Sequence, residues 1–466
     1  MKVIRSRLIA PIVIGLGAVT VPIAAQPTQS TESVAARAAA AGLPDEFVLT
    51  GATILDGTGR RIEGDVLVHD GKIAALGYLP DTGQAMRIDV TGRWITPGII
   101  DVHTHYGTYL LPQTLAPSHN ADVTETSGPN AADTWIEDSV RPADPAFSRA
   151  LRGGVTTLQI LPGSSVMIGG RSVVVHPIPA ITIEQMRIPE AKRGLKMACG
   201  SNSLEEANFP TSRQGQIAFI KRAFLAAQKY NTHETKARRH DNGSNSKARH
   251  HDRDPVADEV SKTMLGVLNG EIPVHLHCYR AEDISNWINL FDEFGTKITA
   301  VHHAAEAYKI AAFLARKETC VVTWPDWWGF KREAEDAIPE NAAFIDAVGG
   351  CVVLHSDIPV LGSMLNLEVA KAAAAGRRAG LDIPPERAIR WITSNAARSL
   401  DLDDRIGSLA PGMNADLVVW SGDPFSVYSS PQRVFIDGKL VFSADENFHD
   451  PPSDFDLGRP QREELK

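Results

Sequence analysis

The chain has 466 residues, of which 43% are hydrophobic and 22% charged, and its formal net charge is −9 at pH 7. This composition is typical of a globular protein, and the length is enough for a barrel-sized domain plus a smaller one. The net negative charge argues against a nucleic-acid partner.

The N-terminal segment has the pattern of an export signal. Lys2, Arg5 and Arg7 precede an apolar run over residues 8–23, and Ala24-Ala25 offers small residues for cleavage. Prolines and glycines interrupt the run, which is short for a membrane span. We therefore expect a signal peptide at 1–25, a poorly ordered lead-in at 26–45 and a periplasmic or secreted mature protein without stable membrane insertion. An uncleaved signal anchor is the alternative.

Short strand-like segments occupy residues 46–97 and resume over residues 405–445. FVLTGATILDGTG and GDVLVHDGKIAALG in the first stretch, and QRVFIDGKLVF in the second, alternate apolar and polar residues between Gly and Asp turns. This pattern predicts one small β-sandwich assembled from both chain ends, followed by a C-terminal tail at 446–466.

Two histidines end the strand-like run that opens the middle of the chain. In WITPGIIDVHTH, a Pro-Gly pair precedes an apolar run that stops at His103 and His105. Residues i and i+2 of a strand point to the same side, so both imidazoles can aim at one point. Such a pair suits a divalent cation such as zinc, although two histidines can also lie near a strand end by chance.

Three further apolar runs end in histidine or aspartate, over residues 272–278, 297–303 and 351–357. Helix-like segments alternate with these runs, which predicts a parallel sheet. In a closed parallel barrel the functional groups lie at the C-terminal ends of the strands, where these residues fall. The sequence therefore predicts an α/β fold in which residues 98–404 form a (β/α)8 TIM-like barrel beside the sandwich.

Beyond residue 45 the chain resembles the amidohydrolase superfamily, and within it the imidazolonepropionase-like amidohydrolases and dipeptidases. PGIIDVHTH resembles the first-strand motif, and ITSNAARSLDLDDRIGSLAPGMNADLVVW (392–420) resembles the return from barrel to sandwich. LPGSSVMIGGRSVVV (161–175) and GLKMACG (194–200) resemble segments of one subgroup of this superfamily. The resemblance implies an enzyme, a metal-dependent hydrolase of carbon–nitrogen bonds. It implies these metal ligands: His103, His105, Lys196, His277, His303 and Asp357.

Alternation along the strands separates neighbouring histidines. His275 and His277 share one face, and we favour His277 as the ligand and His275 as a second-layer or substrate-facing residue. His302 and His303 point to opposite faces, so we expect His303 to be the ligand and His302 to face outward or lie at a strand edge.

Lys196 needs a modification to be a ligand, because an ammonium group repels cations. Carboxylation by carbon dioxide would make it an anion that bridges two metals, as in several amidohydrolases. The alternative is a lysine that binds a substrate carboxylate or pairs with a neighbour.

The expected cofactor is a pair of divalent metals, with zinc preferred, that activates water and polarises a carbonyl. Asp357 is the expected catalytic group, which takes a proton from the attacking water and passes it to the leaving nitrogen. The expected partner is a small-molecule amide, of the dipeptide or N-acyl amino acid type, and a homo-oligomer is left open. Candidate substrate-binding residues are Arg171, Arg280, His275, Trp324 and His355.

The sequence leaves two other functions open. One is a hydrolase with a mononuclear site that acts on an imidazolone, another cyclic amide or an ester. The other is a non-catalytic binding protein. The deaminases of the superfamily usually have glutamate three residues after the fifth-strand histidine, where this chain has Arg280. For Arg171 and Arg280 a structural ion pair is the alternative to binding a substrate carboxylate.

Two further expectations concern the middle of the chain. Residues 231–254 are rich in charge, Gly, Ser and Asn, which predicts a mobile insertion before a helix at 256–268. Cys199, Cys278, Cys320 and Cys351 lie in or beside predicted strands, and we expect them to be small buried residues rather than bridges or metal ligands.

Overall fold

The computed structural model describes residues 43–109, 121–204, 210–241 and 255–445. The predicted signal peptide and C-terminal tail, and nearly all of the lead-in, lie outside these residues. Within the described part of the chain, no helix combines the length and the apolar character needed to cross a membrane.

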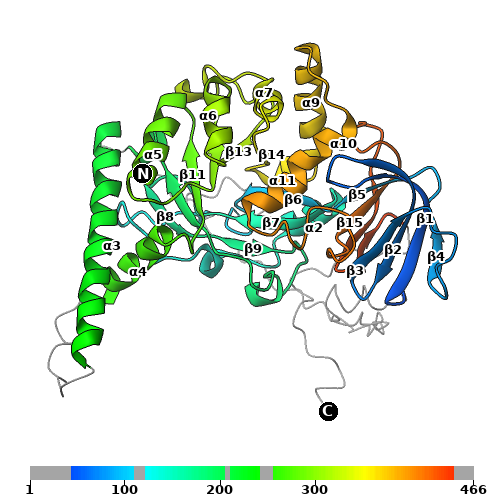
Figure 1. Cartoon of the computed structure of the whole chain (residues 1–466), viewed down its shortest axis with the longest axis horizontal. Coiled ribbons are helices and arrows are strands. Elements are labelled where there is room, and N and C mark those ends of the chain that lie inside the picture. The colour runs from blue at the N-terminus through cyan, green and yellow to red at the C-terminus, as the bar shows by residue number, and fades with distance from the viewer. Residues whose placement is uncertain (1–42, 110–120, 205–209, 242–254, 446–466) are drawn as a thin grey trace, which may run out of the picture.

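Strands from both ends of the chain form one eight-stranded sheet, which lies on the right in Figure 1. β15 pairs antiparallel with β5, so the C-terminal strands continue the sheet that the N-terminal strands begin. Phe47, Ile54, Val66, Leu417 and Phe435 belong to one buried cluster, so the sheet curls around a core of its own. Its strands are β1 (Glu46–Leu55), β2 (Arg61–His69), β3 (Lys72–Gly77), β4 (Met86–Asp89), β5 (Trp94–Pro97), β15 (Leu417–Trp420), β16 (Pro431–Ile436) and β17 (Lys439–Ser443).

The middle of the chain forms two further sheets, with strand orders β14-β13-β12-β11-β10-β8 and β6-β7-β9. β10 to β14 are parallel, as predicted, and so are β6 and β7. The strands are β6 (Ile99–Thr104), β7 (Val155–Ile160), β8 (Ile168–Arg171), β9 (Val173–Val175), β10 (Leu195–Ala198), β11 (Val274–Cys278), β12 (Ala300–His303), β13 (Cys320–Thr323) and β14 (Val352–Leu354).

These pairings differ from an all-parallel ring at β8 and β9, which run antiparallel to β10 and β7 respectively. β8 and β9 belong to different sheets, although Ser172 alone separates them in the chain. At the other edge, the Asp357 amide donates to the His103 carbonyl at 3.0 Å, which brings the end of β14 beside the end of β6.

Helices cover one face of the six-stranded sheet, and the long α3 stands at the left of the molecule in Figure 1. The α-helices are α2 (Pro145–Arg152), α3 (Arg213–Asp241), α4 (Pro255–Leu268), α5 (Ala281–Glu293), α6 (Ala311–Arg316), α7 (Asn341–Ala347), α8 (Pro359–Gly362), α9 (Leu365–Arg378), α10 (Pro385–Ala388) and α11 (Ser394–Ser399). The 3-10 helices are η1 (Ile136–Ser139), η2 (Ile183–Gln185), η3 (Ser201–Ser203), η4 (Ala307–Ile310), η5 (Arg332–Ala334) and η6 (Ile389–Ile392).

The predicted insertion at 231–254 is wrong over its first part, because α3 continues to Asp241. Residues 231–241 contain Glu, Lys, Ala and Arg, which favour helix. Residues 242–254 lie outside the described part of the chain.

The cysteine prediction is also wrong, because Cys199–Cys278 and Cys320–Cys351 are disulfides. Each bridge joins neighbouring strands or their ends, with Cα–Cα distances of 5.1 and 4.6 Å. These spacings lie in the range that a disulfide spans. The sequence could not pair these cysteines, since the pairing depends on the register of parallel strands far apart in the chain.

Candidate metal centre

Strand register brings several of the predicted ligands onto one face of the six-stranded sheet. Lys196 on β10 lies opposite His275 on β11, and His277 lies opposite His302 on β12. Partners in register on neighbouring strands share a face. All four side chains are at most 2% exposed.

The prediction for His302 is therefore wrong, because its ring lies between those of His103 and His275. His302 Nδ1 is 2.8 Å from His103 Nδ1, and its Nε2 is 2.9 Å from His275 Nδ1. The next residue, His303, also reaches the cluster although strand alternation would separate the two. Its backbone leaves the extended conformation, with φ of 69°, and this turn at the strand end redirects the side chain.

A first group of possible ligands consists of His103, His105 and Asp357, from the ends of β6 and β14. Asp357 Oδ1 lies 3.3 Å from His105 Nε2 and 3.5 Å from His103 Nε2. The other nitrogen of His105, Nδ1, is 2.7 Å from the Leu161 carbonyl, which fixes the orientation of that ring. Nitrogen and carboxylate donors in this arrangement suit zinc.

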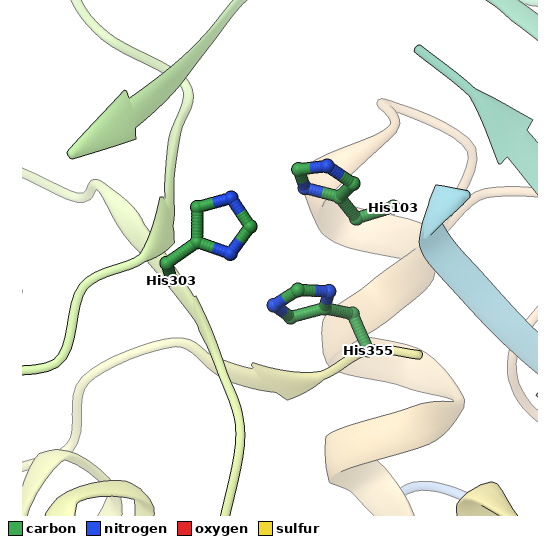
Figure 2. Close-up of side chains that lie close together, drawn as sticks. All are labelled: His103, His303 and His355. Carbon is green, nitrogen blue, oxygen red and sulfur yellow. The ribbon is translucent and has the colours of Figure 1, made fainter. Parts of the chain in front are cut away.

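A second group consists of His103, His303 and His355, whose rings face a common space in Figure 2. The ring centroids of His103 and His303 are 4.8 Å apart, and that of His355 is 4.9 Å from His103 and 5.1 Å from His303. The centroid of His277 lies 4.4 Å from that of His303. The structure thus gives His355, predicted as a substrate-binding residue, a position equivalent to those of the predicted ligand histidines.

Buried ring nitrogens without a hydrogen-bond partner test whether a metal fits these groups. Among the described residues, His103 Nε2, His277 Nε2, His303 Nδ1 and both nitrogens of His355 are such atoms. An unsatisfied buried polar atom is costly unless something binds it. A divalent cation would use these lone pairs, so the residues present fit a metal.

The protonation states agree with this use. Burial, followed by the charge of Lys196, holds the pKa of His103 and of His277 well below the ordinary value. Burial lowers the pKa of His355 to about 3. These rings are neutral at physiological pH, as metal binding requires.

The pKa values of the two aspartates of the site are shifted in opposite directions. Burial alone would raise the pKa of Asp357, but its interactions with His105, His355 and Lys196 outweigh burial, and the pKa lies below its ordinary value. Burial raises the pKa of Asp101 to about 7. Asp101 Oδ1 accepts from the backbone amide of Ser356 at 3.2 Å, which helps to fix the strand end that carries His355 and Asp357.

Lys196 is fully buried, and its Nζ donates to the Pro162 carbonyl at 2.9 Å. Burial lowers its pKa to about 7, against a small opposing effect of Asp357. A large fraction of Lys196 is therefore the neutral amine near pH 7, the form that can react with carbon dioxide. This hydrogen bond to Pro162 is the kind of neighbour contact that the alternative for Lys196 allowed. Carboxylation and binding of a substrate carboxylate both stay predictions.

Aromatic side chains cover the cluster on the side of β13. Trp324 stacks on the ring of His303, with centroids 4.4 Å apart, and Trp327 stacks on Trp324 at 4.6 Å. Tyr279 also stacks on His303, at 5.1 Å. The predicted substrate-facing Trp324 therefore lies against the predicted ligand His303, and its indole Nε1 is buried without a partner among the described residues.

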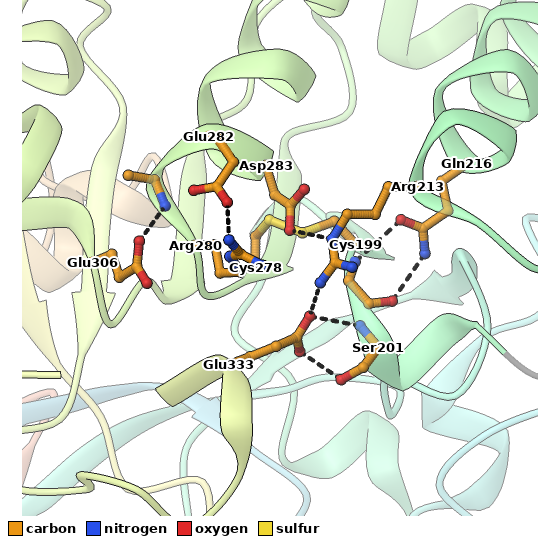
Figure 3. A network of polar contacts seen from close by, with 12 residues as sticks. Cys199, Ser201, Arg213, Gln216, Cys278, Arg280, Glu282, Asp283, Glu306 and Glu333 are labelled. Carbon is orange, nitrogen blue, oxygen red and sulfur yellow. Dashed lines mark hydrogen bonds and ion pairs between the residues drawn. A yellow bond between two sulfur atoms is a disulfide. The ribbon is translucent and has the colours of Figure 1, made fainter. Parts of the chain in front are cut away.

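The two predicted carboxylate-binding arginines lie in different places. Arg171 is opposite Leu195, at the start of β10 and away from the strand end, and its guanidinium donates to the Arg193 carbonyl. The structure does not bring it to the histidines. Arg280 follows the C-terminal end of β11, where the histidines lie. It forms an ion pair with Glu282 (Figure 3), and its side chain is 44% exposed.

A third cation near the site was missed. Lys331 Nζ lies 3.6 Å from the centroid of the Tyr279 ring and 3.3 Å from Glu333. Burial lowers the pKa of Lys331, against the opposing charge of Glu333. Glu333 in turn accepts from the amide and hydroxyl of Ser201 and from Arg213, as Figure 3 shows. No sequence signal identified Lys331, because its loop has no periodicity.

Comparison with known proteins places these observations in a family. The model of the amidohydrolase family matches residues 271–441. An amidohydrolase of Thermotoga maritima, a solved structure, is 33% identical with a TM-score of 0.75, and the match covers 85% of this chain and all of that one. The imidazolonepropionase of Pseudomonas aeruginosa strain UCBPP-PA14 is 25% identical over 399 residues, covering 79% of this chain and 90% of the relative.

The amidohydrolase tasK of Hapsidospora irregularis is 29% identical over 411 residues. That match covers 81% of this chain but 40% of tasK, so the chain spans less than half of that relative.

The fold and the histidine–carboxylate site define a metal-dependent hydrolase. Similarity to the Thermotoga structure over its whole length extends the assignment beyond the residues that the family model matches. The chain belongs to the amidohydrolase family, and it is a hydrolase that acts on carbon–nitrogen bonds.

Proposed function

We propose that the protein is an exported amidohydrolase that cleaves an amide bond next to a free carboxylate, in a dipeptide or an N-acyl amino acid. The observation that carries this is the set of buried, partnerless ring nitrogens beside the Asp357 carboxylate. We further propose that the two sheets of the middle region form the wall of one distorted barrel with the site at its C-terminal end. The hydrogen bond between the Asp357 amide and the His103 carbonyl, which joins the two sheets, supports this proposal.

The metal positions follow from the donor atoms. His103, His105 and Asp357 would hold one cation, and His303 with His355 or the neighbouring His277 would hold a second. Carboxylated Lys196 would supply a further anionic ligand. When bound, divalent zinc supplies an activated water and polarises the scissile carbonyl.

Asp357 acts as the proton carrier. Its low pKa makes it a carboxylate at neutral pH, so it can accept the proton that the attacking water loses. The same group then donates that proton to the leaving nitrogen. The His105 ring beside it keeps the carboxylate oriented toward the cluster.

The cations beside the predicted metal ligands support a substrate that carries a carboxylate. Arg280 is half exposed at the end of β11, and Lys331 lies over Tyr279, which stacks on His303. A charge-assisted hydrogen bond to either would hold a substrate carboxylate on one side of the scissile amide.

Export is supported by the two disulfides, because such bridges persist in oxidising compartments outside the cytosol. The signal-like sequence at 1–25 points the same way. We therefore place the mature chain in a periplasm or outside the cell.

A second candidate is a cyclic-amide hydrolase. The match to an imidazolonepropionase over most of both chains favours it. This alternative uses a mononuclear metal site with the same Asp357 chemistry, and the amide bond that it cleaves lies in a ring.

A substrate panel on zinc-loaded protein separates the candidates. We expect N-acyl amino acids and dipeptides to be hydrolysed faster than their C-terminal amides, and Arg280→Met or Lys331→Met to reduce that preference. Loss of one such contact is worth about 2–3 kcal/mol, or roughly 30–150-fold. Equal turnover of neutral lactams or esters, unaffected by both substitutions, would overturn the carboxylate proposal and favour the cyclic-amide reading.

A further inference from the structure

Behind the ligand histidine His103, three imidazoles and one amide form a continuous buried hydrogen-bond chain. His103 Nδ1 contacts His302 Nδ1 at 2.8 Å, and His302 Nε2 contacts His275 Nδ1 at 2.9 Å. His275 Nε2 then lies 3.1 Å from the Gln159 amide, which also contacts the Ser172 hydroxyl at 3.1 Å. All five residues are at most 1% exposed.

A chain of neutral imidazoles has a direction. Each ring carries one proton, so it donates through one nitrogen and accepts through the other. If His103 donates from Nδ1, then His302 must donate from Nε2 and His275 from Nε2. If the chain runs the other way, His103 carries its proton on Nε2 and has no lone pair there for a metal.

The Gln159 amide ends this chain and permits either direction. Its nitrogen faces His275 in the structure, and its oxygen Oε1 has no partner among the described residues. A half-turn of the amide exchanges the two atoms without changing its shape. The oxygen would then accept the proton of His275 Nε2.

The backbone makes room for this chain at Gly194. A Cβ at this position would lie 2.6 Å from His275 Cδ2 and 3.0 Å from its Nε2. Because the crowded atoms belong to a ring held between two hydrogen bonds, a side chain at 194 would displace His275 from the chain.

We propose that His302, His275 and Gln159 are positioning residues that hold His103 in the tautomer with its proton on Nδ1, and so present Nε2 to the metal. The inference rests on the metal centre of the proposed function. Donation from the ring that binds the metal makes its other nitrogen a better ligand, and loss of such support typically costs about 10–100-fold in metal affinity.

Zinc affinity, measured by competition with a chromophoric chelator, tests the chain without using activity. His302→Phe fills the space but breaks the chain, and we expect zinc binding about 10–100-fold weaker. His302→Gln retains one donor and one acceptor and should restore most of the affinity. His176→Phe is the matched control, since that ring binds the Thr156 carbonyl outside the chain, and it should leave zinc affinity unchanged.

Histidine tautomers in the unmutated zinc-loaded protein give a second test that needs no variant. Long-range proton–nitrogen NMR should place the ring proton of both His302 and His275 on Nε2. Protons on Nδ1 of these rings, or a folded His302→Phe with unchanged zinc affinity, would overturn the proposal. If the unmutated protein takes up no zinc at all, the metal centre itself fails. If zinc binds but its affinity does not change in His302→Phe, the role of the hydrogen-bond chain is refuted and the metal centre is not.

Discussion

The carboxylate of Asp357 lies beside the ring of His105, with Oδ1 3.3 Å from Nε2, although 252 positions separate them in the chain. The contact joins the end of β14 to the end of β6, where the Asp357 amide also binds the His103 carbonyl. The proposed proton carrier thereby lies among nitrogens that can bind metal.

Asp357→Asn should remove the proton carrier while retaining the shape of the side chain. We expect kcat to fall by about 10²–10⁴-fold, because asparagine cannot accept a proton, and cooperative unfolding to be retained. Steady-state kinetics and thermal unfolding measure the two effects. Asp326→Asn, which affects a surface pair with Lys371, is the control and should leave kcat unchanged. Near-normal turnover of Asp357→Asn would exclude this role.

His103 belongs to both possible metal groups, whereas His277 belongs to neither three-residue group but lies against His303. We therefore expect His103→Ala to lose more metal than His277→Ala. Metal analysis of the purified chains should show about two zinc ions in the unmutated protein and a reduced content in both variants. Full loading of His103→Ala would remove that residue from the site.

Lys196→Ala should lose the anion that we propose as a further metal ligand. Metal content and activity should both fall, and added short carboxylic acids should restore part of the activity by filling the space. Rescue should follow the size of the acid, which separates it from a general salt effect. Two metals and normal turnover in Lys196→Ala would refute carboxylation.

The buried Lys196 also predicts a pH dependence of the metal-free protein. Its native pKa, about 7, lies below the ordinary 10.5. Between these values the unfolded chain binds a proton that the native chain does not, so Lys196 makes stability rise with pH. Urea unfolding at pH 7 and pH 9 should show this rise, and Lys196→Met should reduce it. Lys221→Met, at an exposed pair with Glu293, should retain it, and an equal slope in all three proteins would contradict the prediction.

The disulfide Cys199–Cys278 closes a loop of 79 positions beside His277. Replacing both cysteines by serine should reduce the free energy of unfolding by about 4 kcal/mol, because the unfolded chain regains loop freedom. Denaturant unfolding in oxidising buffer measures this change. Reductant opens Cys320–Cys351 in both proteins and Cys199–Cys278 in the unmutated one, so the two proteins should then be equally stable. Identical stability of the two proteins in oxidising buffer would show that the Cys199–Cys278 bridge contributes nothing.

The sequence predicted the parts of this protein that depend on local pattern. Apolar runs that end at His103, His277, His303 and Asp357 predicted buried parallel strands with candidate ligands at their ends. Two local features sufficed: side chains alternate along a strand, and functional groups of a parallel barrel lie at the C-terminal ends of its strands. The motif resemblance predicted the family, and the alternating segments at both chain ends predicted strands that the structure joins in one sheet.

Only the tertiary structure decided how distant segments meet. The pairing of β11 with β12 placed His302 on the inner face, and the positive φ of His303 brought the next ring to the same cluster. Cys199 meets Cys278, and Gln159 meets His275, through strand pairings that no local pattern encodes. Register between parallel strands is set by packing of the whole sheet, whereas a single strand's sequence determines only which of its own residues share a face.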